Sequence, residues 1–213
     1  MRIYLLPGIA CDHRLFDRVN LRGLDVVKLD WPHFRERCGL VDIAKDLSLS
    51  VDATEAHVLV GVSMGGMVAL ELALITKPER VVLISTWTGP GEWPWFVRWS
   101  ARVQAEVLIN SLTMRLAFPA RRLLGARDET TDRFLMAMAL KAGPTQIRRA
   151  THAILRWKGS RWTGSMVRIH GDKDALMPLA LVHADHVVPD GTHAMIYCQP
   201  EAVSAALRTA LTT

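Results

Sequence analysis

The pentapeptide at positions 61–65, Gly-Val-Ser-Met-Gly, constrains the fold of this chain more than any other stretch. It follows an apolar run at 56–60 that favours a β-strand, and an amphipathic run at 67–75 has the spacing of a helix. Gly61 and Gly65 allow the backbone to turn sharply between the two elements. The sequence therefore predicts a strand, a tight turn and a helix, with the Ser63 hydroxyl raised above a sheet edge.

This arrangement is typical of a nucleophile elbow, in which the serine is the attacking group. Because the helix begins at the serine, its free N–H groups and positive dipole end would face a negative charge on a bound carbonyl. A Gly/Ser turn that enters a buried helix would give the same five-residue match. The flanking runs favour the elbow over that alternative.

Short apolar segments alternate with helical patterns through much of the chain. Strands are expected at 2–6, 25–29, 56–60, 80–85, 166–170 and 185–188. Helices are expected from Asp12 or His13 to about Leu21, at 40–50, from the elbow to Pro78, and at 201–211. This alternation predicts an α/β fold with a parallel sheet and helices on both faces.

The strand pattern stops between Trp87 and about Gly164. Helical spacing replaces it in three stripes, the last of which follows a Gly143-Pro144 helix start. The stripes are Trp95, Trp99, Val103 and Val107; Phe134, Leu135, Met138 and Ala139; and Ile147, Ile154 and Leu155. We therefore divide a single domain into a core at 1–86 and 165–213 and a helical lid insert at 87–164.

Charge is distributed unevenly along the 213 residues, whose formal net charge is +5. Positions 87–165 carry 13 Lys and Arg against 5 Asp and Glu, a net +8, while the remainder carries a net −3. The insert could attract anionic substrates through its field. Its arginines could instead solvate the outer faces of helices, and we favour this second interpretation.

Several classes of protein are disfavoured by composition. No window reaches the ~18 consecutive apolar residues that a membrane span needs, and the N-terminal apolar run is short for a signal peptide, so a soluble cytoplasmic protein is expected. The three cysteines, Cys11, Cys38 and Cys198, are scattered and lack C-x-x-C spacing. They indicate neither a disulfide framework nor a zinc site.

A serine nucleophile needs an imidazole to take its proton and a carboxylate to orient that imidazole. The segment at 170–178 follows the fifth strand and offers Asp172 and Asp174, and the segment at 190–193 follows the sixth and offers His193. Carboxyl ends of parallel strands meet at one edge, where open sheets bind ligands. A structural role is the default for the other seven histidines, which are His13, His33, His57, His152, His170, His183 and His186.

Five motifs stand at element boundaries in a fixed order. They are Leu6-Pro7-Gly8, the elbow, the segment at 77–84, the segment at 170–174 with Pro178, and the segment at 191–193 with Gln199-Pro200. On these motifs the chain resembles the α/β-hydrolase superfamily over nearly its whole length. The two leading antiparallel strands of that fold are missing, so the resemblance implies an α/β-hydrolase fold with six strands in the order 2-1-3-4-5-6. About ten residues separate Pro178 from Val188, so the crossover there should shorten to a turn.

The resemblance also implies roles for individual residues. Ser63 would be the nucleophile and His193 the general base and acid. The acid of the family lies three residues after the glycine that ends the penultimate strand, which selects Asp174 and leaves Asp172 as its turn-forming neighbour. The oxyanion hole would use the backbone N–H groups of Met64 and Ile9.

The substrate pocket should lie between the elbow and the insert. Trp87, Trp95, Trp99 and Met195 are candidates for its wall, although the tryptophans could simply dock the insert onto the core. Together these features predict a serine hydrolase that cleaves a small carboxylic ester or thioester through an acyl-enzyme. An acyltransferase or a C–C bond hydrolase could use the same three residues, and a silent binding module is a third possibility.

Related activities that need other residues are disfavoured. A dehalogenase or epoxide hydrolase of this superfamily would need an aspartate in place of Ser63. No Gly-x-Gly-x-x-Gly follows the first strand, so a dinucleotide cofactor is not expected. We expect no cofactor, no metal and no nucleic-acid partner, and the oligomeric state stays open.

Overall fold

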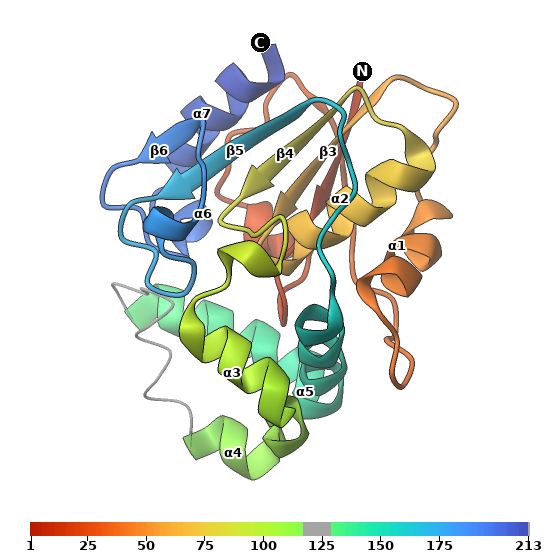
Figure 1. Ribbon diagram of the computed structural model, residues 1–213. Helices are drawn as coiled ribbons and strands as arrows, with labels where there is room; N and C mark the ends of the chain where they lie inside the picture. Colours follow the sequence, from red (N-terminus) through yellow and green to blue (C-terminus); the bar gives the residue numbers. More distant parts are fainter. Residues whose placement is uncertain (117–128, 213) are drawn as a thin grey trace.

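The computed structural model describes residues 1–116 and 129–212. Its centre is one six-stranded sheet, drawn in Figure 1. The strands are β1 (Arg2–Leu6), β2 (Asp25–Lys28), β3 (His57–Val62), β4 (Arg80–Ile84), β5 (Met166–Gly171) and β6 (His186–Val188). They are ordered β2-β1-β3-β4-β5-β6, and every neighbouring pair is parallel. The predicted fold class and strand order are therefore confirmed.

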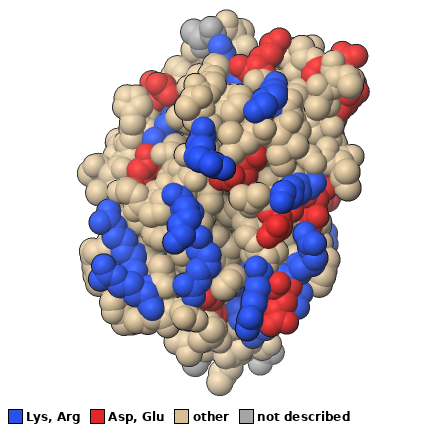
Figure 2. All heavy atoms as spheres, turned by 45° about the vertical axis from the view of Figure 1, so that its right-hand side comes forward, with Lys and Arg blue, Asp and Glu red and all other residues tan. Residues whose placement is uncertain are grey.

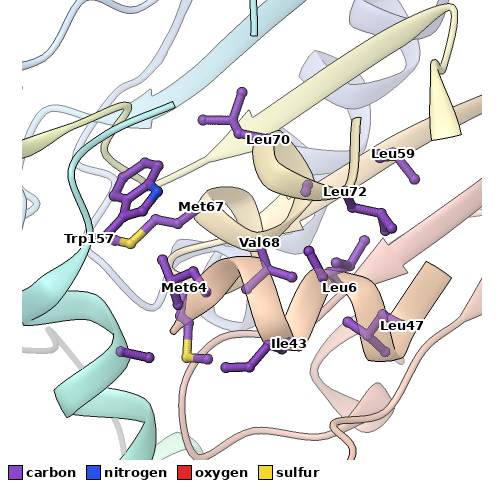
Figure 3. Close-up of a cluster of buried hydrophobic side chains, with 14 of the residues drawn as sticks. Leu6, Ile43, Leu47, Leu59, Met64, Met67, Val68, Leu70, Leu72 and Trp157 are labelled. Atoms are coloured by element: carbon purple, nitrogen blue, oxygen red, sulfur yellow. The ribbon is translucent and has the colours of Figure 1, made fainter. Parts of the chain in front are cut away.

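Side chains of successive strand residues point to opposite faces, so the sheet separates two hydrophobic clusters. Helices α1 (Leu40–Ser48) and α2 (Met64–Thr76) cover one face. Figure 3 shows part of this cluster, in which Leu6 and Leu59 of the sheet lie near Ile43 of α1 and Val68 of α2. The elements η1 (His13–Phe16), α6 (Met195–Cys198) and α7 (Pro200–Thr212) cover the other face.

The segment after β1 differs from its prediction. The expected helix to Leu21 is reduced to the single 3₁₀ turn η1. Leu15 and Phe16 are buried all the same, so the apolar spacing is satisfied without a regular helix. The Asn20 N–H donates to Ser204 Oγ of α7, 2.9 Å away, rather than to a carbonyl of its own segment. A tertiary contact has replaced the helical hydrogen bond here.

The connection between β4 and β5 is helical, and its described residues contain no strand. Its elements are η2 (Pro90–Glu92), α3 (Trp95–Val103), η3 (Ala105–Leu108), α4 (Ser111–Leu116) and α5 (Glu129–Arg156). Positions 117–128 of the predicted insert lie outside the described residues. In Figure 1, α3, α4 and α5 lie beyond the arrowheads of the strands, so the insert stands over the carboxyl edge of the sheet.

Two local predictions concern breaks in helical structure. Gly143 has φ 76° and ψ 160°, which interrupts α5 where the Gly143-Pro144 pair predicts a helix start. Between Pro178 and β6, the crossover contains only the short turn η5 (Leu179–Leu181), as the spacing predicts. In the part of the chain that the structure describes, no helix is both long and apolar enough to cross a membrane.

Candidate active site

Ser63 lies on the turn between β3 and α2 in a strained backbone conformation, with φ 54° and ψ −122°. The turn is held on both sides, because the Ser63 N–H donates to Ile84 O (2.9 Å) and the Ser63 carbonyl accepts from Thr86 Oγ1 (2.5 Å). A strained residue persists only where its surroundings fix it in this way.

Both glycines of the pentapeptide are required by close approach of the backbone. A Cβ atom on Gly61 would collide with the carbonyl oxygen of Gly65. A Cβ atom on Gly65 would collide with the carbonyl oxygens of Leu6 and Pro7, at the end of β1. The turn can therefore pack against the neighbouring strand only with glycine at these positions.

A histidine and a carboxylate approach Ser63 from the loops that follow β6 and β5. His193 Nε2 lies 3.1 Å from Ser63 Oγ, and His193 Nδ1 lies 2.9 Å from Asp174 Oδ2. Since the carboxylate can only accept, Nδ1 carries a proton, and in this tautomer Nε2 is the nitrogen that can accept from the Ser63 hydroxyl. These three side chains, separated by up to 130 positions in the chain, form one continuous relay.

The loops after β5 and β6 hold the histidine and the carboxylate together. The Lys173 N–H donates to the Gly191 carbonyl (2.9 Å), and a Cβ atom on Gly171 would collide with Gly191. The two loops are thus in direct backbone contact, one carrying Asp174 and the other His193. Asp172, the other candidate acid, is exposed and lies outside the relay.

Asp174 is almost fully buried and every oxygen of its carboxylate is used. Oδ1 accepts from the N–H groups of Leu176 (3.0 Å) and Met177 (2.8 Å), while Oδ2 faces His193. Burial by itself opposes ionisation, but His193 and the Met177 N–H outweigh it and hold the pKa of Asp174 below its ordinary value. The acid therefore stays ionised at neutral pH.

Sequence reasoning treated His170 as structural, yet it adjoins this acid. Its Nε2 donates to Met177 O (2.7 Å) and lies 3.7 Å from Asp174 Oδ2. Burial lowers the pKa of His170, so the ring is neutral beside the carboxylate. Its position at the end of β5, four residues before Asp174, was the available sequence signal.

Two backbone N–H groups near Ser63 are available to a bound oxygen. Met64 begins α2, and Ile9 follows Gly8, whose backbone packs against the Ser63 side chain. Neither N–H donates to another described residue. The first N–H groups of a helix have no intrahelical acceptor, which accounts for the free N–H of Met64. Met64 and Ile9 are the two residues of the predicted oxyanion hole.

A cavity of about 280 Å³ opens beside Ser63, between the elbow and the insert. Ile9, Trp87 and Phe96 contribute to its largely apolar wall. The other predicted pocket residues lie elsewhere among the described residues. Trp95 and Trp99 are 79% and 59% exposed on the outer side of α3, because Val97 and Phe96 face inward instead.

Met195 is also outside this cavity. It is fully buried in the cluster on the opposite face of the sheet, where α6 packs. The pocket assignment is therefore corrected to Trp87 alone among the four candidates. Glu106 of η3, which sequence reasoning did not select, also lines the cavity.

The described residues offer no cluster of three or more His, Cys, Asp or Glu side chains that could hold a metal ion. A strained serine between strand and helix, with a histidine and a buried carboxylate at the same edge of a parallel sheet, defines the α/β-hydrolase class of fold and site.

Comparison with known proteins agrees with that class. Residues 3–206 match the family model described as alpha/beta hydrolase family, and the chain belongs to this family. A search of curated proteins found no match.

Solved structures share the fold at low sequence identity. An esterase from Thermogutta terrifontis is 20% identical, with a TM-score of 0.78 over 99% of this chain and 89% of that one. MenH from S. aureus is 15% identical, with a TM-score of 0.76 over 99% and 93%. A bromoperoxidase from Bacillus anthracis is 17% identical, with a TM-score of 0.71 over 100% and 92%. These names cover several activities, so the likeness concerns the fold alone.

Proposed function

We propose that this protein is a serine hydrolase that cleaves small carboxylic esters or thioesters through an acyl-enzyme on Ser63. The observation that carries the proposal is the relay from Asp174 through His193 to Ser63, with hydrogen-bond lengths of 2.9 and 3.1 Å. A binding module would have no need of a serine in a strained turn aligned with an imidazole and an ionised acid.

In the first half of the reaction, His193 Nε2 takes the Ser63 proton as Oγ attacks the substrate carbonyl carbon. The carbonyl oxygen becomes negative, and the N–H groups of Ile9 and Met64 stabilise it. Each such donor contributes roughly 3–4 kcal/mol to lowering the barrier. The protonated imidazole, oriented by Asp174, then gives its proton to the departing alcohol or thiol.

In the second half, water attacks the acyl-enzyme and His193 takes its proton. The tetrahedral intermediate collapses, Ser63 recovers its proton and the carboxylic acid leaves. The cavity beside Ser63 supports a substrate of modest size, because about 280 Å³ is just below the ~300–1,000 Å³ of common ligand pockets. Its apolar wall supports a largely hydrocarbon group there.

The first prediction concerns Ser63 itself. A fluorophosphonate probe should label Ser63 covalently, and p-nitrophenyl esters of short acyl chains should be hydrolysed. Ser63→Ala should abolish labelling and lower turnover by at least ~10³-fold, in line with the deletion of comparable nucleophiles. Mass spectrometry of the labelled peptide and steady-state kinetics measure the two effects.

The matched control is Ser100→Ala, which removes a hydroxyl from the same cavity wall. It should leave labelling intact. Absence of labelling in folded wild-type protein would favour a binding module, and unchanged turnover in Ser63→Ala would mean that another group does the chemistry.

A further inference from the structure

One charged side chain stands in the wall of the Ser63 cavity. Glu106 belongs to η3 of the insert and is only 3% exposed. Its Oε1 accepts from His152 Nδ1 of α5 at 3.0 Å, and an Arg156 guanidinium nitrogen lies 3.7 Å from the same oxygen. Its Oε2 is buried and has no hydrogen-bond partner among the described residues.

An unpaired buried carboxylate oxygen is costly. Leaving a buried acceptor without a donor forfeits its hydration with nothing in exchange, and the loss is greater when the group is charged. A single carboxylate oxygen would have sufficed to join η3 to α5, because His152 and Arg156 both approach Oε1. The structural link to His152 and Arg156 therefore leaves Oε2 unexplained.

The two other hydroxyl groups of this wall are already occupied, whereas the buried Trp87 Nε1 has no hydrogen-bond partner among the described residues. Ser100 Oγ donates to Phe96 O (2.8 Å), and Thr151 Oγ1 donates to Ile147 O (2.8 Å), each within its own helix. Among the described lining residues, Glu106 is the one charged group, and its Oε2 is the one buried side-chain acceptor without a partner. A substrate that fills this cavity can supply the missing donor.

We propose that Glu106 determines substrate specificity by accepting, at Oε2, a hydrogen bond from a hydroxyl group on the substrate portion that fills the cavity. This inference rests on the proposed function, because it assigns the cavity to the acyl group of the substrate. The preferred substrates are then hydroxyacyl esters or thioesters, in which a hydrocarbon chain separates the reacting carbonyl from the hydroxyl.

The surroundings of Glu106 favour a neutral donor over a cationic one. Arg156 already lies beside the carboxylate, so an ammonium group would bring a second positive charge close to the guanidinium. A group that only accepts, such as an ether oxygen, would face the carboxylate with no hydrogen to share. A hydroxyl donates without adding charge.

The test compares p-nitrophenyl esters that differ only at the end of the acyl chain: hexanoate, ω-hydroxyhexanoate, ω-methoxyhexanoate and ω-aminohexanoate. Wild-type kcat/KM should be at least ~10-fold higher for the hydroxy ester than for the methoxy ester, because the site loses a hydrogen bond to a charged acceptor with the latter. In Glu106→Gln the amide can keep its oxygen on His152 and present its NH₂ group to the cavity. The ratio should then fall to one or invert in favour of the methoxy ester.

Glu129→Gln is the matched control, since it removes another carboxylate of the insert, an exposed one that pairs with Arg133 and does not line this cavity. It should leave the ester ratio unchanged. Fluorophosphonate should still label Ser63 in Glu106→Gln, and circular dichroism of this variant should match wild type, which would show that the fold and the relay survive the substitution.

The outcomes separate the inference from the function on which it rests. Ser63-dependent hydrolysis with equal rates for the hydroxy and methoxy esters, or a ratio that Glu106→Gln does not move, would overturn the role of Glu106 alone. A faster amino ester would overturn the hydroxyl in favour of an ammonium group. Failure of wild type to react with any ester or with the probe would overturn the proposed function and the inference with it.

Discussion

At the residue scale, two aspartates of one turn have opposite environments. Asp174 is buried and bonded to His193, whereas Asp172 is exposed and contributes its backbone N–H to Val188 O (3.3 Å). The spacing in the sequence did not decide which of the two carboxylates pairs with the histidine, and the family resemblance selected Asp174. The hydrogen bond to His193 now supports that choice physically.

The prediction at this scale is that Asp174→Asn impairs turnover far more than Asp172→Asn. An Asn amide can donate to His193 Nδ1, which would stabilise the tautomer that carries its proton on Nε2 and cannot accept from Ser63. We expect kcat to fall by at least about 10²-fold in Asp174→Asn and by less than about 3-fold in Asp172→Asn. Steady-state kinetics on both variants, with circular dichroism to check folding, measure this difference, and the reverse ranking would contradict the assignment.

At the scale of elements, an ion pair fastens the start of the insert to the sheet. Arg168 of β5 is 5% exposed and donates to both carboxylate oxygens of Glu92 in η2, at 2.7 and 2.9 Å. Glu92 also accepts from the Thr88 N–H and hydroxyl. Burial opposes ionisation of Glu92, but the Arg168 hydrogen bonds hold its pKa below the ordinary value of 4.5.

We predict that Arg168→Met lowers the free energy of unfolding by about 3–5 kcal/mol at neutral pH, because it leaves a largely buried carboxylate without its counter-charge. A group with a lowered folded-state pKa stabilises the fold above its unfolded value and loses that contribution as pH falls through the folded value. The deficit of Arg168→Met should therefore shrink as pH is lowered from neutral to below 4.5. Urea denaturation at several pH values tests this, and a pH-independent deficit would argue that only packing is lost.

The exit of the insert is fixed differently. Trp157, which follows α5, packs near Met67 of α2 in Figure 3, and its indole N–H donates to buried Glu71 (2.6 Å). One end of the insert is thus held by an ion pair to β5, and the other end is held by Trp157, which packs against α2. The two links fix the roof of the cavity over the strand ends.

At the scale of the whole molecule, positive charge gathers on the insert. On the face drawn in Figure 2, many Lys and Arg side chains lie in the lower half, the level of the insert in Figure 1. Arg102, Arg148, Lys158 and Arg161 have no acidic partner among the described residues. Their charge is therefore not neutralised by a neighbouring carboxylate.

If this charge attracts anionic substrates to the cavity, added salt should slow their arrival. The kcat/KM of a negatively charged ester should fall several-fold as ionic strength rises from ~0.01 to ~0.5 M, whereas that of a neutral ester of the same length should change little. Reversing two charges in Arg148→Glu/Lys158→Glu should remove the salt dependence. A flat response in wild type would instead support the interpretation that the arginines only solvate helix faces.

Sequence patterns correctly predicted the features that depend on residues close together along the chain. The elbow glycines, the break at Gly143 and the shortened crossover after Pro178 each follow from local backbone chemistry, and each is present. The prediction of a regular helix after Asp12 was wrong. The Asn20 N–H instead bonds to Ser204, 184 positions away, and this contact competes with helical hydrogen bonding. Trp95 and Trp99 were misassigned because α3 carries two apolar stripes, and only packing on the core decides which one faces inward.

The amino-acid order by itself determined the strands of a parallel sheet and the serine at the turn after the third, because periodicity and glycine placement act over a few residues. The strand order was implied by the family resemblance. Folding in three dimensions decided which carboxylate meets the imidazole, which tryptophan borders the cavity, and that Glu106 lies beside it with one oxygen unpaired. Those outcomes depend on distances between segments tens of residues apart, and short-range preferences place no constraint on such distances.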